Sequence, residues 1–333
     1  MTRVFANDRL RLAVVDVCNY RCWYCTNEGQ PKDVRSFLPV EFAQRLAAAV
    51  VKEGLWIRKL NVTGGEPTLH SGLCDIVRTL APVAECVTLN TNGHLLDRSL
   101  IRGLRDAGLH NIKFGVDCFG PLRTKPGAPP RLPQSEAILD LVRYAAELMP
   151  RSSVNVVVTP FNASTIGHTI DLLDEYAIDR AEFLETIPPP FPATSAVEVG
   201  MLSIADVVRR HAGQFAMIQY NPKLAKFVCW TRAGIMMQFA EDFCRRRVCG
   251  NLWTRVDARG RLVPCLRANE AEAIRFDRPL AAQIEACNAT MCNGPGGSVP
   301  RDIHGATLAP GCRGAYIRPA FSLVGLEETD VDP

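Results

Sequence analysis

Residues 11–29 read RLAVVDVCNYRCWYCTNEG, an apolar run followed at once by three cysteines. The run has the length and β-branched content of a buried strand. Cys18, Cys22 and Cys25 follow it in a C-x3-C-x2-C spacing, with no fourth cysteine nearby. Three thiolates can ligate three irons of a cubane cluster and leave one iron open, whereas a zinc site needs a fourth ligand. The spacing therefore predicts a [4Fe-4S] cluster with one open iron.

The composition sets broad limits on the function. The 333 residues are 47% apolar and 22% charged, with a formal net charge of +3. A packed core is expected, and the small charge argues against a nucleic-acid partner. The N-terminal stretch lacks the apolar core of a signal peptide, and no apolar run approaches the roughly 20 residues of a membrane span. We expect a cytoplasmic protein without a membrane partner, whose 13 cysteines serve metal or thiol chemistry.

The first half of the chain alternates apolar strands with amphipathic helical stretches, as in a parallel sheet with crossover helices. Helices are expected over 40–53 and 136–148. After Thr186 the sequence IPPPFPA predicts a rigid connector, and helical stretches are expected over 203–210 and 221–238. Six βα units are expected, with strands at 11–17, 57–62, 86–90, 112–116, 154–159 and 182–184.

Polar motifs follow the expected strands. Thr63-Gly64-Gly65-Glu66-Pro67 comes after the second strand, where glycines allow a close backbone approach and a carboxylate can accept from an ammonium group. The carboxyl ends of barrel strands meet at the mouth where ligands bind. The residues at the later strand ends are Asn90, Asn92, Gly115, Asp117, Cys118, Asn155, Thr159 and Asn162.

The three-cysteine spacing at a strand end and the GGEP segment together resemble the radical S-adenosylmethionine (SAM) superfamily. The resemblance covers roughly residues 9–186 and implies an α/β fold, a partial (β/α)6 TIM-like barrel. It implies that the open iron binds the amino and carboxylate groups of SAM, and that reduction of the cluster yields a 5′-deoxyadenosyl radical. The implied SAM contacts are Tyr24, Gly64, Gly65, Glu66, Pro67, Asn90, Asn92, Asp117 and Asn155.

Six further cysteines lie beyond the connector. From Cys244 and from Cys249 the sequence leads through Gly260 to Cys265, and this spacing resembles the start of Twitch and SPASM auxiliary-cluster domains. The resemblance implies a hairpin with a turn over 257–260 that presents thiolates to a second [4Fe-4S] cluster. The full SPASM cysteine run is absent, so we expect one such cluster, with zinc as the alternative. The expected ligands are Cys244, Cys265, Cys287 and Cys292, with Cys312 as an alternative.

Four ligands leave two of these cysteines unassigned. A thiol donates a hydrogen atom readily because its S–H bond is weaker than most C–H bonds. Cys249, or alternatively Cys118, is the candidate hydrogen-atom donor; the other interpretation of each is a small buried side chain. The expected segments are a radical SAM barrel over 1–187, a connector with helices over 188–243, an auxiliary-cluster domain over 244–320 and a tail over 321–333.

The leading hypothesis is a radical SAM enzyme that abstracts hydrogen from a small molecule, similar to the aminoglycoside-biosynthesis enzymes of the neomycin epimerase type. Epimerisation is favoured because Cys249 offers a hydrogen donor, whereas dehydrogenation would use the auxiliary cluster as electron acceptor. Both need a one-electron reductant such as flavodoxin or ferredoxin. Glu182 and Glu185 are candidate groups for binding a cationic substrate.

Three alternatives stay open. A maturase of ribosomal peptides would have a peptide-recognition domain, for which the short stretch before Arg11 leaves no room. A molybdopterin-type cyclase has a related C-terminal three-cysteine set, but its Gly-Gly terminus is replaced here by DVDP. The non-enzymatic alternative is a zinc or iron–sulfur scaffold or an electron carrier.

Overall fold

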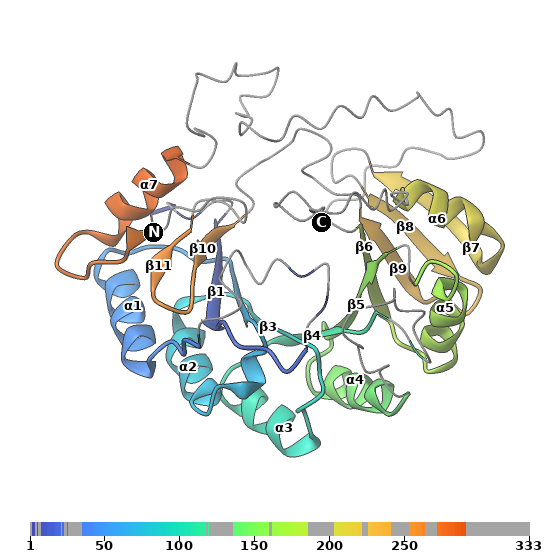
Figure 1. Cartoon of the computed structure of the whole chain (residues 1–333), viewed down its shortest axis with the longest axis horizontal. Helices are drawn as coiled ribbons and strands as arrows, with labels where there is room; N and C mark the ends of the chain where they lie inside the picture. The colour runs from blue at the N-terminus through green and yellow to red at the C-terminus, as the bar shows by residue number, and fades with distance from the viewer. Residues whose placement is uncertain are drawn as a thin grey trace.

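The computed structural model shows six parallel strands that curve into a partial barrel, with helices on its outer face (Figure 1). It describes residues 2–3, 5, 8–20, 22, 25, 35–117, 119, 136–159, 162–185, 203–221, 226–240, 253–263 and 272–290. Within these ranges every helix is too short or too polar to cross a bilayer. The strands are β1 (Arg9–Val15), β2 (Lys59–Gly64), β3 (Val87–Thr91), β4 (Asn111–Gly115), β5 (Ser153–Val158) and β6 (Arg180–Glu185).

A helix follows each of these strands, so the expected (β/α)6 barrel is confirmed. The first helix buries Ala43, Leu46 and Val50, which lie on one face at helical spacing. Asp97 directly precedes the third, and its carboxylate accepts from the Leu100 backbone N–H at 2.7 Å and caps the helix. The helices are α1 (Val40–Lys52), α2 (Leu73–Leu80), α3 (Arg98–Asp106), α4 (Ala137–Leu148), α5 (Ile166–Glu175) and α6 (Ile204–Arg210).

The two faces of the barrel sheet differ in chemistry. Leu10 and Leu12 of β1 are fully buried in the core between the sheet and the helices. Successive residues of a strand point to opposite faces, so Arg9 and Arg11 point into the barrel. Arg9 lies opposite Lys59 of the neighbouring strand β2 in the strand register. The inner face is therefore polar and the outer face apolar.

The prediction of a helix over 221–238 is wrong. Three antiparallel strands lie at 215–221, 226–231 and 236–240 instead. The middle strand buries Phe227, Cys229 and Thr231 at alternate positions, which is the period of a strand. Gly234, with φ of +85°, lies between the second and third strands. The third strand pairs in parallel with β6 and extends the barrel sheet. The strands are β7 (Phe215–Asn221), β8 (Lys226–Thr231) and β9 (Met236–Ala240).

The expected C-terminal hairpin is confirmed. Strands β10 (Thr254–Val256) and β11 (Arg261–Leu262) pair in antiparallel fashion around a turn in which Gly260 has φ of +74°. Strand β10 also pairs in parallel with β1, which aligns Leu10 with Thr254. The hairpin therefore joins the edge of the barrel sheet, and a short strand, β12 (Glu272–Ala273), pairs with β11 beyond it.

Helix α7 (Leu280–Thr290) is attached to the first helix of the barrel. The Glu53 carboxylate, just after α1, accepts from the backbone N–H groups of Leu280 and Ala281 at 2.7 and 2.9 Å. A carboxylate at a helix N-terminus satisfies N–H groups that have no partner within the helix. The C-terminal part of the described chain thus packs on the start of the barrel, as Figure 1 shows.

The end of β2 lies unusually close to the end of β1. The backbone N–H of Gly65 donates to Val15 O and that of Glu66 to Val17 O, both at 2.8 Å. A Cβ atom on Gly64 would lie 2.1 Å from Val15 O, and one on Gly65 would lie 2.0 Å from Val17 O. Only glycine therefore fits at these two positions, and the contact fixes the chain just before Cys18.

This contact predicts that Gly65→Ala lowers the free energy of unfolding by about 1–3 kcal/mol, because the added methyl group overlaps the Val17 carbonyl. Gly213→Ala is the matched control, since a Cβ there meets no atom within 4 Å. The control should change stability by less than about 0.5 kcal/mol. Thermal and denaturant unfolding of both variants measure the difference, and equal stabilities would contradict the steric argument.

Candidate active site

The loop after β1 carries Cys18, Cys22 and Cys25 together. The Cys25 backbone N–H donates to Cys22 O at 3.1 Å. Burial raises the pKa of Cys18 to about 11; the Tyr20 N–H bond to its sulfur opposes this, and nearby Glu66, Cys22 and Cys25 add to it. The three thiols thus lie within electrostatic reach of one another, a donor set that fits three irons of a cubane. Within the described ranges, no group of three or more Cys, His, Asp or Glu side chains is arranged so that it could hold a metal ion.

The end of β3 supports this cysteine loop. The Asn92 side-chain amide donates to Asn19 Oδ1 at 2.8 Å. The Tyr20 hydroxyl lies 3.4 Å from His94 Nδ1, and the two rings are tilted with centroids 5.7 Å apart. Residues after two parallel strands therefore meet at the carboxyl edge of the sheet, as the strand-end motifs predict.

Glu66 is the buried link between the ends of β2 and β3. Its side chain is almost fully buried, and its Oε1 accepts from the Thr68 N–H at 3.0 Å and from the Thr68 and Thr91 hydroxyls at 2.6 Å each. Its Oε2 accepts from the Asn92 N–H at 2.8 Å. The carboxylate thereby positions the loop around Asn92. The contact of Glu66 with SAM stays a prediction. Thr91 lies within the predicted Asn90–Gly93 motif, whereas sequence reasoning missed Thr68, which directly follows the GGEP segment.

Asp117 and Asn162 join the ends of β4 and β5. Asp117 Oδ1 accepts from the Val157 N–H at 3.0 Å. The Asn162 amide donates to Asp117 O at 2.7 Å and to Val157 O at 2.8 Å. These bonds hold two strand ends in register at the barrel mouth, and the SAM contact of Asp117 stays a prediction.

The side chains of Asn90 and Asn155 point into the barrel, and each has a side-chain oxygen that could accept a further hydrogen bond. The side-chain Oδ1 atom of each is buried and has no hydrogen-bond partner among the described residues. A buried acceptor without a partner costs about 1–3 kcal/mol, so a ligand donor at this point would stabilise it. Both asparagines are expected SAM contacts, and this geometry fits that role.

Several expected site residues lie outside the described residues, so their roles remain predictions. Cys287 is described: it lies on α7, where burial and then the charge of Glu272 raise the pKa of its thiol to about 11. Of the cysteines expected to bind the second cluster, Cys287 is thus the one that lies within the described residues. The residues outside the described ranges are Tyr24, Cys118, Cys244, Cys249, Cys265, Cys292 and Cys312.

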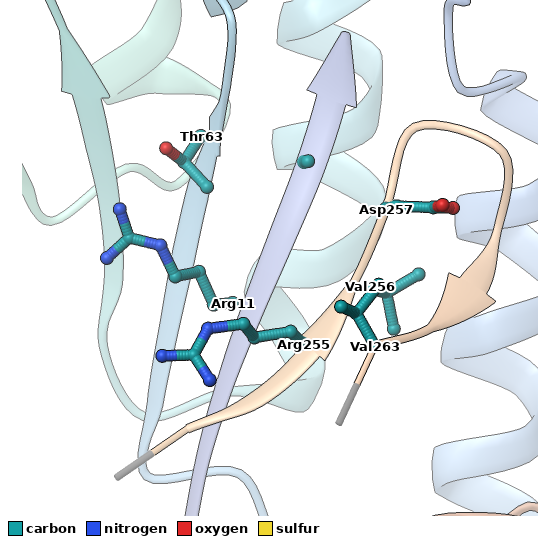
Figure 2. A pocket seen from close by; sticks show the side chains of 7 residues that line it. Arg11, Thr63, Arg255, Val256, Asp257 and Val263 are labelled. Atoms are coloured by element: carbon teal, nitrogen blue, oxygen red, sulfur yellow. The ribbon is translucent and has the colours of Figure 1, made fainter. Parts of the chain in front are cut away.

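A small pocket opens between β1, β2 and β10. Arg11 pairs laterally with Arg255, and Figure 2 shows both guanidinium groups extending to the same side of their strands, near Thr63. Asp257, at the other side of the pocket, accepts from the Arg261 side chain at 2.7 Å and belongs to the hairpin turn. Sequence reasoning missed this arginine pair, because the parallel pairing of β1 with β10 brings together residues far apart in the chain.

A charged triad lies on the inner face of β4, β6 and β8. Lys113 Nζ lies 3.0 Å from Glu182 Oε2, and Lys226 Nζ donates to Glu182 Oε1 and to Gln238 at 3.2 Å. Burial raises the pKa of Glu182, but the two lysines outweigh it and lower the pKa to about 2. Glu182 thus forms ion pairs with two lysines of the chain. These pairs argue against the expectation that Glu182 binds a cationic substrate.

Comparisons with known proteins agree with this geometry. Residues 12–173 match the family model of the Radical SAM superfamily. The GTP 3′,8-cyclase of Sulfurimonas denitrificans is 29% identical over 280 residues, covering 80% of this chain and 83% of that protein. The GTP 3′,8-cyclase of Alkaliphilus metalliredigens is 28% identical over 296 residues, covering 86% and 88%.

Solved structures share the fold. SuiB of Streptococcus suis, bound to precursor peptide SuiA, superposes with a TM-score of 0.58 at 17% identity, covering 82% of this chain and 64% of that chain. Native anSMEcpe with bound AdoMet gives a TM-score of 0.57 at 16% identity, covering 84% and 81%. At 16–17% identity these likenesses show the fold alone. Residues 12–173, which include the cysteine loop at the end of β1, therefore match a domain of the radical SAM superfamily.

Proposed function

We propose that this chain is a radical SAM enzyme that acts on an anionic nucleotide and closes a ring within a purine nucleoside triphosphate. The observation that carries the proposal is the positive charge on the inner wall formed by β1, β2 and β10. The names of the relatives, GTP 3′,8-cyclases, support the same substrate class and a bond between the 3′ and 8 positions.

The inner wall favours a bound anion. Burial and the charge of Arg58 lower the pKa of Arg9, and burial followed by Arg9 and Arg58 lowers the pKa of Lys59. A cation whose pKa is lowered lies where further positive charge is unfavourable, and an anion relieves this repulsion. Arg11 and Arg255 lie beside them and present planar guanidinium groups, which suit phosphate oxygens. The charge of this wall therefore suits a triphosphate.

The same charge argues against an aminoglycoside. A polyamine substrate would bring positive charge to a wall that is already cationic, and Glu182 is occupied by two lysines. We therefore place cyclisation ahead of the epimerisation and dehydrogenation expected from the sequence. All three begin by abstraction of a substrate hydrogen, and they differ in the fate of the substrate radical.

The residues divide into three roles in this proposal. Cys18, Cys22 and Cys25 hold the cluster, which with SAM and an external one-electron reductant supplies the 5′-deoxyadenosyl radical. Asn90 and Asn155 offer buried acceptors to SAM. The arginines of β1 and β10 hold the triphosphate and so orient the ribose toward the strand ends where SAM binds.

The direct test uses the anaerobically reconstituted, reduced protein with SAM and GTP deuterated at C3′. A new bond at C3′ requires loss of that hydrogen, so deuterium should appear in 5′-deoxyadenosine and a cyclised nucleotide should form. Neomycin serves as the alternative substrate, in D2O to detect hydrogen returned by a thiol. Transfer of label from neomycin but not from GTP would contradict the nucleotide proposal.

Arg255→Gln should raise the KM for GTP by about 10- to 100-fold, since charged hydrogen bonds contribute about 1.5–3 kcal/mol. Its effect on the dissociation constant of SAM should be small. Arg151→Gln, at an exposed position outside the barrel, is the matched control and should leave both constants unchanged. Steady-state kinetics at two salt concentrations measure the effect, and an unchanged KM in Arg255→Gln would remove Arg255 from the triphosphate site.

Glu66→Gln should weaken SAM binding by about tenfold, because an amide replaces one acceptor oxygen with a donor and cannot accept all four bonds at Glu66. The loop at Asn92 then loses its support. Glu147→Gln, on the exposed face of α4, is the control. Equilibrium SAM binding to proteins of equal iron and sulfide content separates this effect from loss of the cluster; wild-type affinity would show that Glu66 does not position the SAM site.

A further inference from the structure

We propose that Lys113, Glu182 and Lys226 form a base-reading subsite that binds the O6 and N7 acceptors of a guanine ring. This inference rests on the proposed function, because it assumes a nucleotide in the barrel. In this proposal the guanine base contacts β4, β6 and β8, whereas the triphosphate contacts β1, β2 and β10. The subsite would also make the protein prefer guanine over adenine.

The triad faces the barrel interior from three strands. Asn155 of β5 pairs laterally with Glu182 of β6, which pairs with Gln238 of β9, so these side chains share the inner face. The Glu182 side chain is 17% exposed and that of Lys226 is 20% exposed. The triad is thus partly desolvated and still open to a ligand.

The two lysines retain donors for such a ligand. An ammonium group carries three N–H donors. Among the described residues, Lys113 uses one on Glu182, and Lys226 uses two, on Glu182 and Gln238. Toward the part of the chain that the structure describes, two donors on Lys113 and one on Lys226 therefore remain. Because Glu182 bonds both ammonium groups, one through each oxygen, it holds the two sets of donors side by side.

The charge of the triad favours a neutral acceptor over a phosphate. Two lysines and one carboxylate sum to a single positive charge, and the carboxylate repels an anion that approaches closely. The other wall carries Arg9, Arg11, Lys59 and Arg255 side by side, and Asp257 of its pocket is bonded to Arg261, so positive charge prevails there. The two walls therefore suit different parts of one ligand.

The curvature of the sheet brings the two walls to opposite sides of the barrel. Figure 1 shows β1 and β10 at one side and β6, β8 and β9 at the other, with β2 to β5 between them. Electrostatic coupling also connects the walls, since Lys113 contributes to the lowered pKa of Lys59. A ligand with an anionic end and a neutral polar end can contact both.

Guanine offers the edge that matches the triad. Its O6 and N7 atoms are two adjacent acceptors, and lysine and arginine commonly bind this pair. Adenine has N7 as an acceptor but carries an N6 amino donor, which cannot pair with an ammonium group. Hypoxanthine keeps both O6 and N7. The triad should therefore bind GTP and ITP alike and discriminate against ATP.

The experiment measures equilibrium binding of GTP, ITP, ATP and inorganic tripolyphosphate to the reconstituted, SAM-loaded protein without reductant. The wild type should bind GTP and ITP about tenfold more tightly than ATP. Lys226→Met and Lys113→Met should each weaken GTP and ITP about tenfold and leave tripolyphosphate within twofold. Glu182→Gln should also leave tripolyphosphate within twofold and should reduce the preference for GTP, because the amide no longer holds both ammonium groups.

Lys52→Met, at an exposed position of α1, is the matched control. The midpoint of thermal unfolding and the affinity for SAM show whether each variant folds. If Lys226→Met does not fold, Lys226→Gln takes its place. Equal weakening of GTP and tripolyphosphate in the lysine variants, or an unaltered preference for GTP, would overturn the base-reading role. A wild type that binds neither GTP nor tripolyphosphate would overturn the proposed function itself.

Discussion

Two backbone hydrogen bonds, from Gly65 to Val15 and from Glu66 to Val17, determine how the ends of β1 and β2 meet. They place the GGEP segment against the chain that enters the cysteine loop. The Glu66 carboxylate then extends this contact to Thr91 and Asn92 at the end of β3. Because each bond orients the next strand end, displacement of the Gly65 backbone would change the cluster loop and the SAM contacts together.

The barrel could be predicted from the sequence because its signals are local. RLRLAVV at β1 alternates apolar and polar residues, and each expected strand of the barrel overlaps an observed one. The helix predicted over 221–238 was wrong, because KFVCWT buries alternate residues as a strand does. Alternation, together with Gly234 as a turn signal, would have indicated strands.

The site was predicted unevenly for the same physical reason. Motifs that follow strands directly, such as GGEP, are visible in the sequence. The pairing of Arg11 with Arg255 and of Lys113 with Glu182 depends on strand order and register, which no local pattern reports. A signal was present, however: cations alternate with buried leucines at Arg9 and Arg11. That pattern indicates a polar barrel interior and would have favoured an anionic substrate over an aminoglycoside.

The parallel pairing of β1 with β10 also has a consequence for biosynthesis. About 240 residues separate the two strands, so at roughly 5–20 residues per second the ribosome needs roughly 12–48 s to supply the partner of β1. During this interval β1 has an unpaired edge beside the cysteine loop, and such edges invite pairing with other chains. The hairpin of β10 and β11 covers this edge only after most of the chain has been made.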